Sequence, residues 1–292
     1  MISKGGSQVK LCDLHTHSNC SDGSCTPAEL VRMAEAAGLS AIALTDHNTA
    51  KGLPQFMEAG QGSPVITVPG CEFTTDYEGR ELHIVGLFFE EAYWPEIEDH
   101  VELMRLAKHN ANQQMIKALR QAGYDICYEE VAATTEAEEF NRAHVARLLL
   151  SKGYVGSVSE AFNGILKEGN GFYTPPRRLS SLGTIRFIRE YGAVAILAHP
   201  YLNMNEAELE AFLPRAKKAG LEAMETRYTD FDEATTQKAM AMAERFGLLQ
   251  SGGSDFHGKA KPQIQLGRGR GQLAVPFSFY EALCPKEARQ KE

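Results

Sequence analysis

Short apolar runs alternate with amphipathic helical stretches near both ends of the 292-residue chain. Near the start, Thr26-Pro27 is a typical helix opening, so a helix is predicted over residues 28–37 up to Gly38, followed by a strand at 39–45. The last third repeats this order, with predicted helices at 180–191, 206–219 and 232–246 and strands at 193–198, 221–226 and 248–251. Repeated strand–helix units predict an α/β protein with a parallel sheet, open or closed.

The middle of the chain lacks this alternation. Between residues 95 and 178 the pattern predicts no strand, and amphipathic stretches predict helices at 96–122, 143–151 and 158–166. The segment ends in a turn-rich sequence. We therefore expect one main domain built from residues 1–94 and 179–292, with a small helical insertion at 95–178 that acts as a substrate cap.

Histidines and carboxylates lie within or just after six of the apolar runs. The positions are His15, His17, Asp46, His47, Glu72, His83, His199, Asp255 and His257. Because ligands at the ends of neighbouring strands must converge on one centre, this pattern favours a sheet that closes into a barrel. Mixed imidazoles and carboxylates suit Mn, with Fe or Zn as alternatives, and their number exceeds the needs of a single ion. Two to three divalent metal ions are expected.

The local spacing indicates what individual residues do. His15 and His17 are two residues apart in an extended segment, so both side chains point to the same side and can hold one ion. A turn then returns the carboxylate of Asp22 toward the same place. Asp13 and Asp46 stand directly beside predicted ligands and are expected to support them through hydrogen bonds.

Glu72 is the natural bridge between two ions, because each oxygen of a carboxylate can hold one of them. Each residue taken singly also has an ordinary explanation; for example, a histidine such as His83 in an apolar strand is usually a hydrogen-bonded core residue. The joint placement at strand ends outweighs these explanations. His100 and His109 lie in helical stretches, and for them the ordinary explanation stands.

Composition narrows the class of protein. A net charge of −8 argues against a general nucleic-acid binder, so no long nucleic acid is expected as a partner. No apolar stretch approaches the roughly 20 residues of a membrane span, and no secretory signal is recognised, so we expect a cytoplasmic protein without a membrane partner. The six cysteines include no CxxC pair and are expected to be free thiols. The oligomeric state stays open.

The clusters resemble the successive motifs of a known family. The matching segments are Asp13-Leu-His15-Thr-His17-Ser, Thr45-Asp46-His47-Asn48, Cys71-Glu72, His83-Ile, Ala198-His199-Pro200 and Gly253-Ser-Asp255-Phe-His257. In this order they resemble the PHP (polymerase and histidinol phosphatase) family. The resemblance implies a distorted (β/α)7 barrel with a trinuclear metal centre. It implies one ion held by His15, His17, Glu72 and Asp255, a second by Glu72, His83 and His199, and a third by Asp22, His47 and His257.

The helical insertion resembles that of a subgroup of small-nucleotide phosphoesterases. The segment that carries this resemblance is Asn141-Arg142-Ala-His144. Arg142 and one of Arg177 and Arg178 are expected to clamp a phosphate, because a guanidinium matches phosphate oxygens in bidentate geometry. His144 would hold a phosphate or protonate the leaving oxygen. Taken alone, each arginine is more ordinarily a solvated surface residue.

The expected function is hydrolysis of a small phosphorylated substrate by a metal-dependent phosphoesterase. A metal-bridging hydroxide would attack phosphorus in a nucleoside 3′,5′-bisphosphate or a ribose cyclic phosphate. The residues expected to act in catalysis are Glu72, His144, His199 and Asp255. Two alternatives are a 5′–3′ exoribonuclease acting on short RNA and a histidinol phosphatase. A non-catalytic metal-binding barrel is disfavoured, because an idle cluster of carboxylates is costly to keep assembled.

Overall fold

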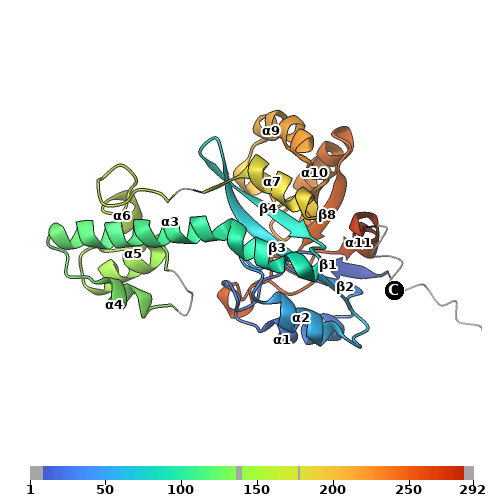
Figure 1. Ribbon diagram of the computed structural model, residues 1–292, viewed down its shortest axis with the longest axis horizontal. Helices are drawn as coiled ribbons and strands as arrows, with labels where there is room; N and C mark the ends of the chain where they lie inside the picture. Colours follow the sequence, from blue (N-terminus) through green and yellow to red (C-terminus); the bar gives the residue numbers. More distant parts are fainter. Residues whose placement is uncertain (1–8, 136–139, 177, 286–292) are drawn as a thin grey trace, which may run out of the picture. The chain divides into compact units, whose positions relative to one another are not determined.

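The computed structural model describes residues 9–135, 140–176 and 178–285, which form two compact units (Figure 1). The first unit contains the chain up to Glu98 and from Leu179 onward, and the second contains Asp99–Arg178. The first unit is built around one sheet with the strand order β8-β7-β6-β4-β3-β2-β1-β9, and β5 pairs with β3 beside this path. The strands are β1 (Leu11–Asp13), β2 (Ala41–Leu44), β3 (Ile66–Tyr77), β4 (Arg80–Leu87), β5 (Leu179–Ser180), β6 (Val194–Leu197), β7 (Ala223–Tyr228), β8 (Leu249–Gly253) and β9 (Val275–Pro276).

The sheet is mixed, so the prediction of a parallel sheet is wrong for part of it. Strands β1, β2 and β3 are parallel to one another, as are β6, β7 and β8, but β4 is antiparallel to both of its neighbours. The reason is local. Glu78 and Gly79 have φ angles of 54° and 83° and separate the paired residues Tyr77 and Arg80, so β3 and β4 form a tight two-residue hairpin.

The sheet closes where the chain just beyond β1 meets β8. The Leu14 N–H donates to the Gly252 carbonyl at 3.1 Å, and the Asp255 N–H donates to the His15 carbonyl at 2.9 Å. This approach depends on Gly253, because a Cβ there would lie only 2.5 Å from the backbone nitrogen of His15. The sheet therefore closes into a barrel.

Helices pack around the outside of this barrel (Figure 1). They are α1 (Pro27–Ala36), α2 (Leu53–Gly60), α7 (Ser181–Glu190), α8 (Pro200–Asn203), α9 (Glu206–Ala219), α10 (Glu233–Arg245) and α11 (Phe277–Leu283), with short 3-10 helices at Glu91–Tyr93 and Gly258–Ala260. Apolar strand residues, among them Val68, Val85 and Ile196, are buried in one core cluster. Burial of these strands on both faces explains why they read as continuous apolar runs in the sequence.

The second unit is helical, as the sequence predicts for this segment. Helix α3 (Trp94–Gln121) begins in the first unit and continues into the second, where α4 (Tyr128–Ala132), α5 (Arg142–Ser151) and α6 (Val158–Asn163) follow it. This unit has its own apolar core, which includes Leu119, Phe140 and Leu149. Within the described ranges, no helix combines the length and the apolar character needed to cross a membrane.

Candidate metal centre

The structure brings all nine predicted metal ligands together in one cluster. His15 and His17 follow β1, His47 follows β2, Glu72 lies in β3, His83 lies in β4, His199 follows β6, Asp255 and His257 follow β8, and Asp22 lies in the loop after His17. Backbone pairing places His47 and Glu72 side by side. The Glu72 N–H donates to the Asp46 carbonyl, and the Glu72 carbonyl accepts from the Asn48 N–H. Residues separated by up to 242 positions in sequence thus share one site.

The carboxylate of Glu72 is the centre of this site. It is fully buried and faces five imidazoles. Its Oε2 lies 3.2 Å from His15 Nε2, 3.3 Å from His17 Nε2 and 3.0 Å from His47 Nδ1, and its Oε1 lies 2.8 Å from His83 Nδ1 and 3.0 Å from His199 Nε2. Each oxygen is therefore placed to contact a different group of ligands, which is the geometry of a bridging carboxylate.

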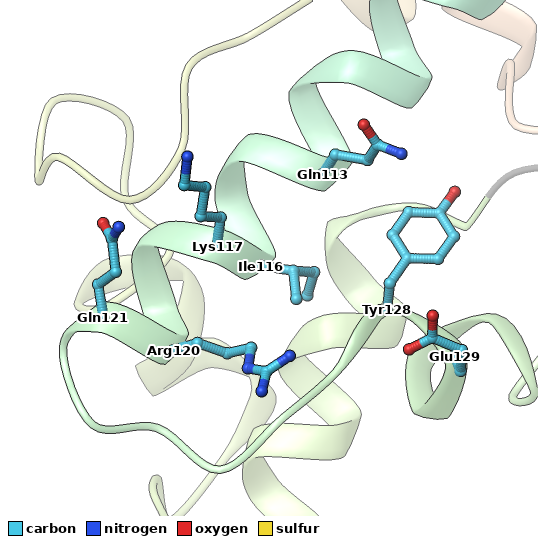
Figure 2. Close-up of a pocket in the computed structure, with 7 residues that line it drawn as sticks. All are labelled: Gln113, Ile116, Lys117, Arg120, Gln121, Tyr128 and Glu129. Atoms are coloured by element: carbon cyan, nitrogen blue, oxygen red, sulfur yellow. The ribbon is translucent and has the colours of Figure 1, made fainter.

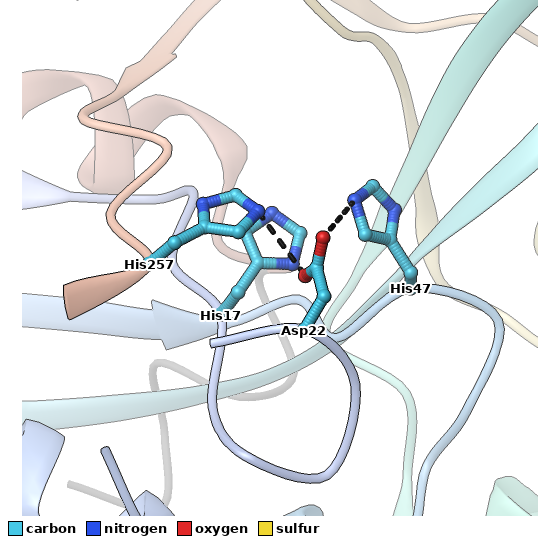
Figure 3. Close-up of side chains that lie close together, drawn as sticks. All are labelled: His17, Asp22, His47 and His257. Atoms are coloured by element: carbon cyan, nitrogen blue, oxygen red, sulfur yellow. Dashed lines mark ion pairs between the residues drawn. The ribbon is translucent and has the colours of Figure 1, made fainter. Parts of the chain in front are cut away.

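Two aspartates complete the cluster. Asp255 Oδ1 lies 3.1 Å from His17 Nε2 and 3.7 Å from His15 Nε2. Figure 3 shows Asp22 between His257 and His47. Its Oδ1 lies 3.1 Å from His257 Nε2, and its Oδ2 lies 3.9 Å from His47 Nε2. The Asp22 side chain is 56% exposed, whereas that of Asp255 is 7% exposed. The cluster is therefore open to solvent on the side of Asp22.

Several buried atoms of these residues have no hydrogen-bond partner among the described residues. They are Nε2 of His15, His17, His83 and His257, Nδ1 of His17, His47 and His199, and Oε2 of Glu72. Unpartnered buried polar atoms are costly and need an explanation, and a bound cation supplies one. The residues present therefore fit divalent metal ions.

The ligand atoms form four overlapping groups, each within 4.8 Å. They are His17, Asp22, His47 and His257; His15, Glu72 and His199; His15, His17 and Asp255; and His47, Glu72 and His83. Each of His15, His17, His47 and Glu72 belongs to two groups. Proximity alone therefore allows more than one division of the ligands among ions, and the division implied by the family resemblance stays a prediction.

The carboxylate of Glu72 and the imidazoles around it shift one another's pKa values. Burial alone would raise the pKa of Glu72, but the neighbouring His15 and His83 lower it well below its usual value, so Glu72 stays an anion. Burial lowers the pKa of His17 to about 3, helped by the charge of His47, and leaves this imidazole neutral. For His83 burial acts in the same direction, but the charge of Glu72 outweighs it and raises the pKa to about 10.

Comparison with known proteins now identifies the family. The profile of the PHP domain matches residues 13–169, which is more than half of the chain. The chain belongs to the PHP family. A 5′–3′ exoribonuclease from Haemophilus influenzae is 31% identical over 250 residues, which cover 85% of this chain and 90% of that protein. The resemblance that the sequence motifs indicate is thus confirmed.

Other relatives carry different names. A 3′,5′-nucleoside bisphosphate phosphatase from Chromobacterium violaceum is 29% identical, with 84% of this chain and 86% of that protein covered. A phosphoribosyl 1,2-cyclic phosphate 1,2-diphosphodiesterase from Eggerthella lenta is also 29% identical, over 85% and 94% of the two chains. A predicted metal-dependent phosphoesterase of known structure from Bifidobacterium adolescentis gives a TM-score of 0.74 at 25% identity, over 94% and 95%. The expected fold, a distorted (β/α)7 barrel, is confirmed by this likeness and by the closed sheet.

Asp13 and Asp46 support the PHP cluster through the backbone of its loops. Asp46 Oδ1 accepts from the Ser18 N–H at 2.7 Å and from the Ser21 hydroxyl at 2.6 Å, which fixes the loop between His17 and Asp22. Asp13 accepts from the Ser254 N–H at 2.8 Å and the Gly267 N–H at 2.7 Å, beside Asp255. Both aspartates are buried. They position the ligand loops and make no contact with an imidazole in the structure.

Glu225 is a residue of the site that the sequence analysis misses. Its Oε1 lies 2.8 Å from His15 Nδ1, and its Oε2 accepts from the backbone N–H of His199 at 2.6 Å. His199 has a φ angle of 27°, a left-handed conformation that is strained for a residue with a Cβ. Glu225 is 1% exposed on β7. An acidic residue inside the predicted strand 221–226 is the signal that could have pointed to it.

Tyr228 and Lys261 are also missed, and both contact Asp255. The Tyr228 hydroxyl donates to Asp255 Oδ2 at 2.8 Å, and Lys261 Nζ donates to the same oxygen at 2.9 Å. Neither residue stands in a motif of the sequence, because Tyr228 ends β7 and Lys261 lies in a loop after His257. Only the tertiary structure places them at the metal centre.

Arg142 has contacts within the second unit. Its guanidinium lies over the ring of Tyr173 at 4.1 Å and over that of Phe162 at 5.3 Å, and Nη1 donates to the Leu166 carbonyl at 3.3 Å. These are cation–π contacts that hold the side chain between aromatic residues. The guanidinium is therefore held in a defined position, with donors other than Nη1 left for a ligand.

His144 and Arg178 also lie in the second unit, and Arg177 lies outside the described residues. His144 Nδ1 accepts from the Asn141 N–H at 3.2 Å, and Asn141 in turn caps α5. Partial burial, together with the charge of Arg147, lowers the pKa of His144. Its imidazole is therefore neutral near pH 7, and the roles expected for these residues stay predictions.

The second unit also has a pocket of its own, between α3 and α4 (Figure 2). Its volume is about 460 Å³, and its lining includes the charged residues Lys117, Arg120 and Glu129. None of the predicted site residues lines it. We assign it no part in the chemistry of the metal centre.

Proposed function

We propose that this PHP-family chain is a metal-dependent phosphoesterase that hydrolyses a nucleoside 3′,5′-bisphosphate or a ribose cyclic phosphate. The observation that carries the proposal is the buried carboxylate of Glu72 among five imidazoles, each within 3.3 Å. Relatives of similar identity are named for a nucleoside bisphosphate and for a phosphoribosyl cyclic phosphate, which supports a small substrate with two phosphate groups.

The nine clustered residues would hold two to three divalent ions. Mn is our first choice, with Fe or Zn as alternatives, because imidazole and carboxylate ligands suit all three. Such ions lower the pKa of a coordinated water and neutralise charge that develops on phosphoryl oxygens. In this proposal Glu72 would be shared between two ions, and His199 and Asp255 would each help to hold one of them.

The exposed part of the cluster defines where a substrate enters. Asp22 and His47 have side chains that are 56% and 25% exposed, whereas those of His15, His17 and Glu72 are fully buried. A phosphoryl group therefore reaches the ligands from the side of Asp22 and His47. The inner residues exclude water from the rest of the cluster and keep their ligand atoms in place.

The helical unit supplies the contacts to the rest of the substrate in our proposal. Arg142, together with Arg177 or Arg178, binds a phosphate that does not react, because guanidinium donors match phosphate oxygens. His144 holds a phosphate or protonates the leaving oxygen; because its pKa is lowered, the protonated form that the second role needs is the minor one near pH 7. Support for Arg142 comes from its fixed position against Tyr173, since a pre-positioned side chain loses little entropy when it binds.

The net charge and the cysteines bear on the size of the substrate and on the compartment. The net charge of −8 disfavours long nucleic acids as substrates, since these need a basic surface. We also propose that the protein acts in the cytoplasm, where small phosphorylated nucleotides and reduced thiols are found. Its six cysteines are free in the structure, in keeping with a reducing compartment.

A panel of substrates tests the proposed reaction. Phosphate release by the Mn-loaded protein is measured with adenosine 3′,5′-bisphosphate, AMP, ribose 1,2-cyclic phosphate 5-phosphate, a 5′-phosphorylated tetranucleotide RNA and histidinol phosphate. Ring opening of the cyclic ester releases no phosphate and is followed by 31P NMR. We expect the bisphosphate or the cyclic phosphate to give the highest kcat/KM. The control is Glu72→Ala, which removes the bridging ligand and should give no turnover.

Preference for histidinol phosphate, or turnover that Glu72→Ala retains, would contradict the proposal. A second variant tests the helical unit. Arg142→Ala should raise KM for the bisphosphate and leave AMP hydrolysis unchanged, because AMP lacks the second phosphate. Equal losses on both substrates would place Arg142 at the reacting phosphate instead.

The second candidate is a 5′–3′ exoribonuclease that acts on short RNA. It is favoured by the Haemophilus influenzae relative of that name, which is 31% identical over 85% of this chain. In this case the 5′-phosphorylated RNA would release mononucleotides one at a time, and kcat/KM would rise from the dinucleotide to longer oligomers. A fall in kcat/KM with length favours the small substrate instead.

A further inference from the structure

Lys261 stands beside the metal centre on a turn that is anchored on both sides. The turn follows His257, and its Lys259 N–H donates to the Ser24 hydroxyl at 2.7 Å. The Lys261 N–H donates to the Gly258 carbonyl at 3.2 Å, and its own carbonyl accepts from the Ile264 N–H at 3.0 Å. These hydrogen bonds hold the backbone of Lys261 in place.

The ammonium of Lys261 reaches the cluster through Asp255. Nζ lies 2.9 Å from Asp255 Oδ2, while Asp255 Oδ1 lies 3.1 Å from His17 Nε2. One oxygen of this carboxylate thus faces the metal ligands and the other faces the lysine. The Lys261 side chain is 37% exposed, so its ammonium is held against the cluster and is still open to solvent.

Asp255 does not depend on Lys261 alone for its orientation. The Tyr228 hydroxyl donates to the same Oδ2 at 2.8 Å, and this ring is buried. The carboxylate would stay in place if the ammonium turned away, because the tyrosine still holds it. An ammonium has three donors and needs only one for Asp255, so two are left for another anion.

We propose that Lys261 binds the reacting phosphoryl group at the Asp255 side of the metal centre. The inference rests on the proposed phosphoesterase function and names one more residue that contacts the substrate. A phosphate monoester carries roughly two negative charges at pH 7, and a charge-assisted hydrogen bond to an ammonium is among the stronger contacts that a protein offers it. Tyr228 acts as the positioning residue that keeps Asp255 directed at the ligands.

Binding of inorganic phosphate to the Mn-loaded protein tests this proposal without turnover. Isothermal titration gives the Kd for phosphate, and elemental analysis gives the Mn content of the same samples. Lys261→Met should weaken phosphate binding by about 10- to 100-fold, as expected for loss of one hydrogen bond to a charged group. Its Mn content should equal that of the wild type, because Tyr228 still holds Asp255.

Three further variants separate binding from positioning. Lys259→Met removes an exposed lysine from the same turn and should leave the Kd unchanged. Lys261→Arg keeps the positive charge and should bind phosphate within about 5-fold of the wild type, since arginine also donates to phosphate. Tyr228→Phe removes a donor to Asp255 without changing the charge, and it should lower Mn affinity while phosphate affinity per loaded site is kept.

Two results would overturn the inference. An unchanged phosphate Kd in Lys261→Met would show that the lysine makes no contact with the anion. Loss of Mn from Lys261→Met, with normal phosphate affinity in the molecules that keep Mn, would mean that the lysine only positions Asp255. In either case wild-type turnover on the substrate panel would leave the phosphoesterase function intact, so the two failures are distinguishable.

Discussion

Replacement of Glu225 by glutamine removes one negative charge while keeping the size and shape of the side chain. Glu225 uses both oxygens as acceptors, one beside His15 Nδ1 at 2.8 Å and one from the His199 N–H at 2.6 Å. An amide has only one oxygen, so it can accept from only one of the two groups. The glutamine can therefore keep only one of the two buried hydrogen bonds.

Both choices are unfavourable. If the amide oxygen keeps the His199 N–H, its NH2 group faces His15 Nδ1 and drives the ring proton onto Nε2, the atom 3.2 Å from Glu72 Oε2. If the oxygen turns to His15, the His199 N–H loses its acceptor, at about 1–3 kcal/mol for an unsatisfied buried group. Loss of a carboxylate behind a metal-bound histidine typically lowers metal affinity by about 10- to 100-fold, or roughly 1.4–2.7 kcal/mol, which agrees.

The assay is competition for Mn against a chelator of known affinity, with elemental analysis of the bound metal. Glu225→Gln is expected to raise the Kd for the most weakly bound Mn by about 10- to 100-fold. The matched control is Glu222→Gln, three residues earlier, where the carboxylate pairs with Arg189 at the surface. Such an exposed pair contributes about 0–1 kcal/mol, so this control should bind Mn as the wild type does.

Wild-type Mn affinity in Glu225→Gln would refute the reasoning, because both the tautomer of His15 and the conformation of His199 would then be fixed without the carboxylate. A lower melting temperature with normal Mn affinity would also refute it. In that case Glu225 would contribute to stability alone.

Three further predictions follow from the cluster and from the closure of the barrel. Glu72→Ala should lower metal affinity, measured by chelator competition, by more than the roughly 10- to 100-fold loss that is typical when a residue behind the ligands is replaced. Near-normal metal content would contradict a bridging role. Gly253→Ala should destabilise the fold by at least about 1–3 kcal/mol in urea unfolding, because the new Cβ would lie 2.5 Å from the His15 backbone nitrogen; an unchanged midpoint would show that the strands separate easily. In the metal-free protein Glu72 raises the pKa of His83 to about 10, and the pKa of His15 is raised well above its usual value, so both imidazoles hold protons at pH 7 that Mn must displace. Calorimetry in buffers of different ionisation enthalpy should therefore detect proton release when Mn binds. Mn affinity should rise as the pH increases toward 10.

Signals close together in the sequence predict several helices accurately. Residues 206–219 were expected to form a helix, and α9 has these bounds because Asn205 and Glu208 form a capping box and Gly220, with a φ angle of 112°, ends it. The signal for the metal-centre residues is equally local, since all of them except Asp22 stand within or just after an apolar run. The sequence therefore predicts which residues meet, provided that the strands converge.

The direction of β4 could not be inferred in this way. The hairpin at Glu78-Gly79 lacks the Asn-Gly or Asp-Gly pair that usually marks such a turn, so β3 and β4 read as independent strands. The pairing of β4 with β6, more than 100 residues away, is then decided by the whole sheet. Strand direction is a property of the packed barrel, because backbone hydrogen bonds are satisfied in either direction.

The sequence by itself determined the candidate ligands, the alternation of strands and helices and the family of this protein, because these depend on residue type and spacing along the chain. Only the tertiary structure decided that Glu225 contacts two ligands from different strands, that Tyr228 and Lys261 share one oxygen of Asp255, and that His17 belongs to two ligand groups. The physical reason is that these contacts join residues from separate strands and loops, which come within hydrogen-bond distance only when the barrel closes.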